Sequence, residues 1–220
     1  MSTLYTNARF WSAGQEIFHD LLVKDSIILA TGEQTKEFTA ETTIDLNGAF
    51  VIPAFLDGHA HPIFAGREAA GPKINGINSI EEIKAQVKAF AQANPTTPWI
   101  IGGAYEAAII EGGDFDATWL DEVVSDRPVV LHAVDHHTIW VNSKAIEVAG
   151  ITSATKDPQG GTIARHSDGS AKGTLREPSA MALVLNHAPT NTIESDIAAI
   201  TYACAEYRKV GVIAAIDSWC

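Results

Sequence analysis

Short apolar runs recur along this chain, and stretches with the periodicity of helices separate them. Strands that alternate with helices run parallel, because each helix returns the chain to the same end of the sheet. The pattern therefore predicts an α/β protein, and four β/α units make up half of an eight-fold β/α barrel. The four runs are residues 51–56, 98–102, 128–134 and 212–217.

Capping residues and hydrophobic periodicity predict the helices between these runs. Ser79 and Glu82 have the spacing of a capping box, and Asn94 with the proline after it marks the end of that helix. Gly150 stands where a left-handed residue usually follows a helix. Further helices are expected over residues 115–124, 143–149 and 191–210.

Two segments depart from the β/α alternation. Residues 1–50 contain short strand-like runs that cannot bury much apolar surface alone. Residues 160–176 predict a β-hairpin around Asp168-Gly169, inserted into the β/α region of residues 51–220. Because half a barrel leaves open edges, we expect the chain to be the N-terminal part of a longer protein or one piece of a cut one. The strands of the first segment are expected at residues 8–11, 20–24 and 26–30.

Composition argues against several kinds of partner. The formal net charge of -12, from 27 acidic and 15 basic residues without a basic cluster, disfavours nucleic acid and anionic membranes. The sequence shows neither the pattern of a signal peptide nor an apolar run of membrane-spanning length. Cys204 and Cys220 form no zinc motif or disulfide framework, which fits a reducing cytoplasm. We expect a cytoplasmic protein with a small-molecule substrate. Whether the protein forms a homo-oligomer is left open by the sequence.

The strongest chemical signal is a His-x-His pair that follows the apolar run 51–56. Side chains two residues apart on a strand share a face, so His59 and His61 can offer ring nitrogens to one ion, with Asp57 on the same face. Neutral imidazole is the commonest transition-metal ligand. With eight histidines in 220 residues the spacing also arises by chance, and two ordinary histidines at a strand end are the alternative.

The order of several motifs resembles the amidohydrolase superfamily. The early motifs match the opening of that superfamily, and the later ones narrow the resemblance to amidohydrolase family 3, the YtcJ-like metal-dependent hydrolases. Ala54 departs from the family pattern, which usually has glycine there. The resemblance covers nearly the whole chain. The motifs stand at residues 22–32, 45–48, 51–62, 135–145, 160–161 and 173–177.

The resemblance implies the N-terminal half of a distorted (β/α)8 TIM barrel, preceded by a small β-sandwich segment over residues 1–50. It also implies one or two divalent ions, with zinc as the expected metal, and His59 and His61 as their first ligands. Glu177 is implied as an acidic metal ligand or a catalytic substrate contact, and His137 as a catalytic substrate contact. The remaining ligands of the family lie on later strands that this chain does not contain.

The implied activity is hydrolysis of C–N bonds other than peptide bonds, in an amide, an N-acyl amine or an N-formyl amine, by metal-activated water. The remaining half of the barrel would come from the same longer chain or from a second piece. The alternative is a catalytically incompetent fragment or truncated paralogue that acts as a structural, partner-dependent module. Two histidines alone rarely hold zinc.

Other prominent side chains have structural alternatives. Glu177 can equally be a surface glutamate, and His137 a hydrogen-bonded loop histidine that Asp135 orients. Trp140 and Asn142 are taken as structural residues first. His132 and His136 are also expected to be structural, and no role is assigned to His19, His166 and His187.

Overall fold

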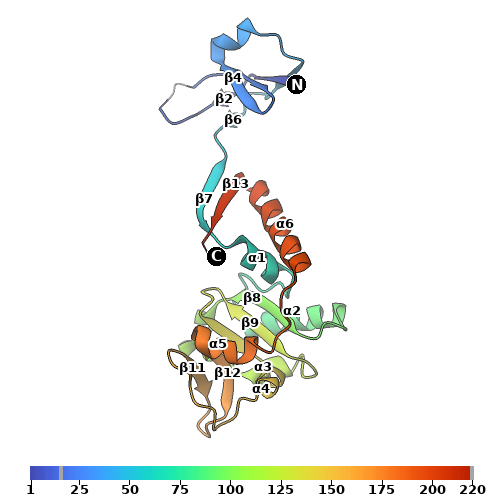
Figure 1. Cartoon of the computed structure of the whole chain (residues 1–220), viewed down its shortest axis with the longest axis vertical. Coiled ribbons are helices and arrows are strands. Elements are labelled where there is room, and N and C mark those ends of the chain that lie inside the picture. Colours follow the sequence, from blue (N-terminus) through green and yellow to red (C-terminus); the bar gives the residue numbers. More distant parts are fainter. Residues whose placement is uncertain (15–16, 219–220) are drawn as a thin grey trace. The chain divides into compact units, whose positions relative to one another are not determined.

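The chain divides into two compact units in a computed structural model, which describes residues 1–14 and 17–218 (Figure 1). The first unit comprises Met1–Gly58 together with Val210–Ala215. The second comprises His59–Lys209 and the chain from Ile216. No helix in the described part of the chain is long and apolar enough to cross a membrane.

The first unit is built from short strands. Its larger sheet has the order β4-β3-β1-β5, and β2 pairs with β6 in parallel. Asp25 and Ser26 form the tight β3–β4 turn with positive φ values of 50° and 66°, as a two-residue hairpin loop requires. The expected strands correspond to β2, β3 and β4, whereas β1 was not anticipated. The elements are β1 (Ser2–Thr6), β2 (Arg9–Phe10), β3 (Leu21–Lys24), β4 (Ile27–Thr31), the 3-10 helix η1 (Gly32–Glu37), β5 (Thr42–Asp45) and β6 (Phe50–Val51).

A mixed sheet organises the second unit, in the order β11-β12-β10-β9-β8. Only β8 and β9 run parallel, and the other neighbours in this sheet are antiparallel. The predicted runs 98–102 and 128–134 thus pair in parallel as expected, whereas the antiparallel neighbours are the predicted hairpin and β10, a strand that was not predicted. Between β9 and β10 lie only residues 134–137, too few for the crossover that a parallel pair needs. The strands are β8 (Ile100–Tyr105), β9 (Val129–Ala133), β10 (Thr138–Val141), β11 (Thr162–Arg165) and β12 (Ala171–Arg176).

Six α-helices occur among the described residues of the second unit. The predicted cap is present, since Ser79 Oγ accepts a hydrogen bond from Glu82 N at 3.4 Å. Gly150 has a φ of 64°, as expected after a helix. Pro62 begins a helix that was not expected, because a fixed φ and a missing N–H suit the first helical position. The helices are α1 (Pro62–Ala69), α2 (Ile80–Ala93), α3 (Ala117–Asp121), α4 (Ser143–Val148), α5 (Glu177–Leu185) and α6 (Ile193–Lys209); short 3-10 turns occur at η2 (Ala107–Ile109) and η3 (Glu111–Gly113).

Apolar side chains cover both faces of the mixed sheet. Along β9, Leu131 belongs to a cluster that also contains residues of α2 and α3, and Val130 belongs to a cluster with residues of α4 and α5. This division follows from the alternation of side chains along a strand. Trp140 is fully buried in the first cluster beside Phe115, with ring centroids 4.9 Å apart.

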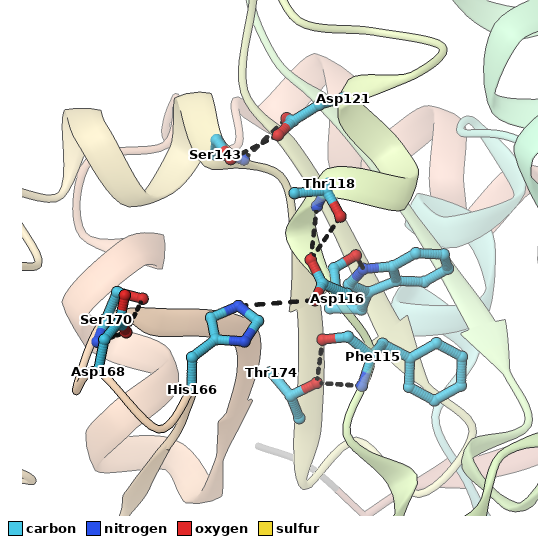
Figure 2. Close-up of polar contacts among 10 residues, drawn as sticks. Phe115, Asp116, Thr118, Asp121, Ser143, His166, Asp168, Ser170 and Thr174 are labelled. Carbon is cyan, nitrogen blue, oxygen red and sulfur yellow. Dashed lines mark hydrogen bonds and ion pairs between the residues drawn. The ribbon is translucent and has the colours of Figure 1, made fainter.

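The predicted hairpin is joined to the rest of this unit by polar contacts (Figure 2). Thr174, on β12, accepts a hydrogen bond from Phe115 N at 2.8 Å and donates one to Phe115 O at 3.0 Å. His166, near the hairpin turn, lies 3.5 Å from a carboxylate oxygen of Asp116. Asp116 also caps α3 through Thr118. The hairpin is thus tied to the start of α3.

The strand that carries the histidine pair begins later than expected. β7 (Phe55–Ala60) pairs with β13 (Val212–Asp217), whose bounds match the prediction. Bonds from Phe55 N to Gly211 O and from Ser218 N to Ala60 O lie at the two ends of the pair, so the strands run in the same direction.

The continuously apolar run of residues 51–56 is typical of a strand that is buried on both faces of a parallel sheet, and that prediction is wrong here. Pro53 has no N–H to donate to a ladder, and the strand starts after it. Leu56 is 72% exposed and Phe55 is 54% exposed, because β13 is the only strand paired with β7 in the described part of the chain.

Candidate functional site

His59 and His61 lie side by side where β7 ends. His59 belongs to the strand, and His61 follows it directly as the residue before α1. Their rings meet edge to face, with centroids 5.2 Å apart. The carbonyl of His61 accepts a hydrogen bond from Ala65 N at 3.1 Å, which joins the histidine to the first turn of the helix. The strand and the helix start therefore hold both imidazoles in one place.

A carboxylate from the neighbouring strand faces this pair. Asp217 ends β13, and its Oδ1 lies 3.9 Å from His61 Nδ1. Sequence reasoning did not single out Asp217, although it ends a parallel strand, where ligand sites gather in α/β proteins. Two imidazoles and a carboxylate are donor types that divalent zinc accepts.

The described residues supply only part of a metal site. Within residues 1–14 and 17–218, no three His, Cys, Asp or Glu side chains lie close enough together to hold a metal ion. Zinc usually takes three or four protein ligands. The donor chemistry of His59 and His61 therefore fits a divalent ion, whereas the number of ligands falls short.

A third histidine, from the loop after β9, adjoins the pair. His136 has a φ of 58°, uncommon for a residue other than glycine, and its ring lies 5.5 Å from that of Phe64. Its Nδ1 is 3.5 Å from Glu68 Oε1. Phe64 in turn lies 6.5 Å from the ring of His61. These contacts connect the histidine pair to the interior of the second unit.

Burial disfavours charge on the side chains around His136. It raises the pKa of Glu68 to about 7 and lowers the pKa of His132 to about 4. The pKa of His136 is lowered as well, by burial first and then by the nearby His61. Sequence reasoning missed Glu68. The available signal was its helical spacing from Phe64, which places both side chains on one face of α1.

His137 and Glu177 form a separate pair. His137 Nδ1 lies 3.0 Å from Glu177 Oε2. The pKa of His137 is raised, mainly by this hydrogen bond and then by the charge of the carboxylate. Both side chains are at least half exposed. Asp135, expected to orient the ring, instead accepts a hydrogen bond from the backbone N of His137 at 2.9 Å.

Glu177 is held in an unusual backbone conformation. Its φ is 68°, a left-handed value that a side chain with a Cβ disfavours, and its N–H donates to His137 O at 2.7 Å. The structure brings Glu177 to His137 and does not place it in a three-ligand group with His59 and His61. The ligand and catalytic roles of Glu177 and His137 stay predictions.

The residues taken as structural have structural contacts. Asn142 is fully buried and donates to Val124 O and Arg127 O, each at 2.9 Å. The indole of Trp140 donates to Asp116 O at 2.9 Å. These two structural interpretations are confirmed.

Comparison with known proteins adds a family match. The sequence model of a family described as the amidohydrolase family matches residues 42–220. The putative amidohydrolase YtcJ of Bacillus subtilis is 35% identical over 173 residues, which are 76% of this chain and 32% of that protein. The N-substituted formamide deformylase of Arthrobacter pascens is 27% identical over 184 residues, 80% of this chain and 34% of the deformylase.

A solved structure shares the fold. An uncharacterized metal-dependent hydrolase from Pyrococcus furiosus aligns with a TM-score of 0.65 at 21% identity, over 98% of this chain and 44% of the other. The curated relatives that match most of this chain are longer, and the aligned residues span between 32% and 49% of their lengths.

Proposed function

The chain belongs to the amidohydrolase family, and from this membership we propose that it forms the metal-binding part of a hydrolase that acts on C–N bonds other than peptide bonds. The observation that carries the proposal is the placement of His59 and His61 where β7 ends, with Asp217 of the parallel neighbour facing them. Strand ends of this kind are where barrel enzymes gather catalytic groups.

The proposed metal is divalent, with zinc expected and one or two ions. A bound ion of this kind supplies a Lewis acid and lowers the pKa of water at neutral pH. His59 and His61 serve as ligands, and Glu177 is the proposed acidic ligand. Asp217, whose Oδ1 lies 3.9 Å from His61 Nδ1, would orient the ring of His61 once a metal is bound, as carboxylates beside ligating histidines commonly do.

The proposed substrate is a small amide, N-acyl amine or N-formyl amine. The relative named N-substituted formamide deformylase supports the N-formyl group among these. His137 and Glu177 are proposed to contact the substrate, because both side chains are accessible and they hold each other at 3.0 Å. A hydrogen-bonded pair presents a fixed polar edge to a ligand.

The whole protein is proposed to be a distorted (β/α)8 barrel with a β-sandwich segment, of which this chain is the N-terminal part. The shorter length relative to the matched proteins supports this, as do the exposed apolar side chains of β7. The missing half would come from the same longer chain or from a second piece. We place the protein in the cytoplasm, with self-association as a further proposal.

A second candidate is a catalytically incompetent, partner-dependent module. The observation that favours it is the lack of a three-ligand metal group among the described residues. The two candidates differ in what the chain does with metal and substrate.

A substrate panel tests the hydrolase. The longer protein would be incubated with zinc and matched N-formyl, N-acetyl and N-benzoyl amines, and amine release would be measured. We expect release that a chelator abolishes and that falls at least a hundredfold in His59→Ala. Hydrolysis that resists both the chelator and the substitution would refute the metal-dependent assignment, and hydrolysis of cyclic amidines alone would refute the amide class.

A further inference from the structure

The strand that leads to Glu177 is attached to a segment outside its own sheet. Besides pairing with β10 and β11, β12 contacts residues 112–117, which include the end of η3 and the start of α3. Thr174 is fully buried, and its hydroxyl is hydrogen-bonded to both the N–H and the carbonyl of Phe115 (Figure 2). A Cβ added to Gly173 would lie 2.5 Å from Ala117 N. Another segment therefore holds β12, in addition to its neighbours in the sheet.

Arg176, the last residue of β12, binds the same segment. Its Nη2 donates to Gly112 O at 2.9 Å and to Asp114 Oδ1 at 2.6 Å. The side chains of Arg176 and Asp114 are partly exposed, and an ion pair of this kind adds little to folding stability. These contacts therefore affect the position of the chain at Arg176 more than the stability of the fold.

Glu177 needs such anchoring because of its backbone conformation. Its φ of 68° is disfavoured for a residue with a Cβ, and Pro178 restricts the residue before it further. A conformation of this kind persists only where the surrounding structure fixes it. Arg176 is bound to residues 112–114 just before Glu177, and the N–H of Glu177 itself donates to His137 O at 2.7 Å. These two attachments fix the backbone at Glu177.

The register of β10 and β12 links this anchoring to the position of two side chains. Thr138 pairs with Arg176, so His137 and Glu177 each lie one residue beyond the paired residues. Their side chains meet there, with His137 Nδ1 3.0 Å from Glu177 Oε2. A shift of β12 away from residues 112–115 would therefore disturb this contact.

We propose that Thr174 and Arg176 are positioning residues, which bind residues 112–115 and thereby hold the Glu177 carboxylate beside His137 in the geometry that contacts the substrate. The contact with substrate rests on the proposed hydrolase function. The anchoring of Glu177 requires neither metal nor substrate, so the two ideas can fail separately.

Hydrogen–deuterium exchange of the Glu177 amide, measured in the longer protein without metal, tests the anchoring. Arg176→Met removes the guanidinium and keeps an unbranched stem, and exchange at Glu177 should become about tenfold faster. Thr174→Val leaves the two Phe115 groups unpaired and should act in the same direction, whereas Thr174→Ser keeps the hydroxyl and the exchange rate of the parent. Unchanged exchange at Glu177 in Arg176→Met and Thr174→Val would overturn the proposal.

Arg165→Met is the matched control. Arg165 lies on β11 of the same hairpin and also donates to backbone carbonyls, those of Thr152 and Gly169, at 3.3 Å and 2.8 Å. This variant loses arginine–carbonyl bonds of the same kind but keeps those to residues 112–115, so the Glu177 amide should exchange as in the parent. Equal acceleration in Arg165→Met and Arg176→Met would indicate general loosening of the hairpin and contradict the positioning role.

Kinetics of the longer protein with zinc and an N-formyl amine test the consequence for the reaction. Arg176→Met should lower kcat/KM about tenfold, because a small displacement of a group that contacts substrate slows the reaction. Arg165→Met should keep the kcat/KM of the parent, and both variants should unfold at similar temperatures. A parent-like kcat/KM in Arg176→Met, despite faster exchange at Glu177, would overturn the role in the reaction. If the parent hydrolyses no amide, the hydrolase proposal fails, and the exchange measurement alone decides whether Thr174 and Arg176 anchor Glu177.

Discussion

At the residue scale, burial disfavours the charged forms of Glu68 and His132, two side chains near the histidine pair. The sequence predicted His59 and His61, because a two-residue spacing on a strand is visible without a structure. It did not predict the environment of Glu68, since that environment depends on His136, which is distant in sequence and reaches Glu68 from a loop. The helical spacing of Glu68 from Phe64 was the available sequence signal, and it does not show by itself that the carboxyl group is buried.

The titration of Glu68 predicts a pH effect on stability. The native pKa is about 7 and the ordinary value is 4.5, so the native state keeps a proton that the unfolded chain releases in this window. Stability contributed by this proton is present below about pH 4.5 and is lost as the pH rises through about 7. The free energy of unfolding of Glu68→Gln, relative to that of the parent, should therefore rise by on the order of 2 kcal/mol from pH 5 to pH 8. This figure is kept below the value of the full pKa shift because the carboxyl is partly solvated.

Urea unfolding of both proteins at several pH values measures this gain. His132 acts in the opposite direction, because its pKa is lowered to about 4 and its burial therefore costs stability as the pH falls below 6.5. That contribution is common to both proteins and cancels in their difference. A difference that does not change between pH 5 and pH 8 would contradict the buried environment assigned to Glu68.

At the element scale, helix ends were more predictable than strand partners. The cap at Ser79 and the glycine at position 150 are local signals, and both were read correctly. The start of β7 was predicted too early, because an apolar run does not show where strand pairing begins. The strand starts only after Pro53. β10 was missed because its antiparallel pairing follows from a short loop rather than from periodicity.

Packing between α1 and α6 supports the helix that follows the histidine pair. The two helices are far apart in sequence and lie side by side (Figure 1). A Cβ added to Gly66 would lie 2.1 Å from Ala199 O, so the backbones meet where only glycine fits. The ion pair between Arg67 and Asp196, at 2.7 Å, crosses the same interface.

Gly66→Ala should destabilise the chain by about 1–3 kcal/mol, because the methyl group forces the helices apart. Chemical denaturation measures the change. Gly58→Ala is the matched control, since a Cβ there meets nothing within 4 Å. The packing argument would fail if both alanine variants unfolded at the same denaturant concentration.

At the scale of the whole molecule, the chain exposes more apolar surface than a finished domain needs. Leu56 on β7 and Ile213 on β13 are 72% and 70% exposed. In the first unit, β4 is an edge strand with Ile27 and Ile28 exposed, and an uncovered apolar edge invites pairing. We propose that further parts of a longer protein cover these surfaces.

This proposal predicts a difference in dye binding. The chain alone should enhance the fluorescence of anilinonaphthalene sulfonate severalfold more than an equimolar amount of the longer protein, because the added part covers the apolar strands. Replacing both Ile213 and Ile216 by serine should reduce the signal of the chain alone. Equal enhancement by the chain and the longer protein would show that these strands stay uncovered.

Composition and motif order predicted a mixed α/β member of this family, because both can be read from the sequence without knowing which residues are in contact. The strand pairing around the candidate metal site, and the presence of any ligand beyond the histidine pair, depend on long-range contacts that local patterns do not encode. Asp217 is an example, since only the register of β13 beside β7 places it near His61.

Metal content tests the central claim most directly. The longer protein would be dialysed against zinc, separated from free ion and measured by elemental analysis, alongside its variants His59→Ala, His61→Ala and the control His187→Ala, an exposed histidine outside the site. We predict about one ion per chain in the parent and the control, and loss of the ion in both site variants. A parent chain without zinc, or a His59→Ala variant that keeps it, would contradict the assignment of His59 and His61 as metal ligands.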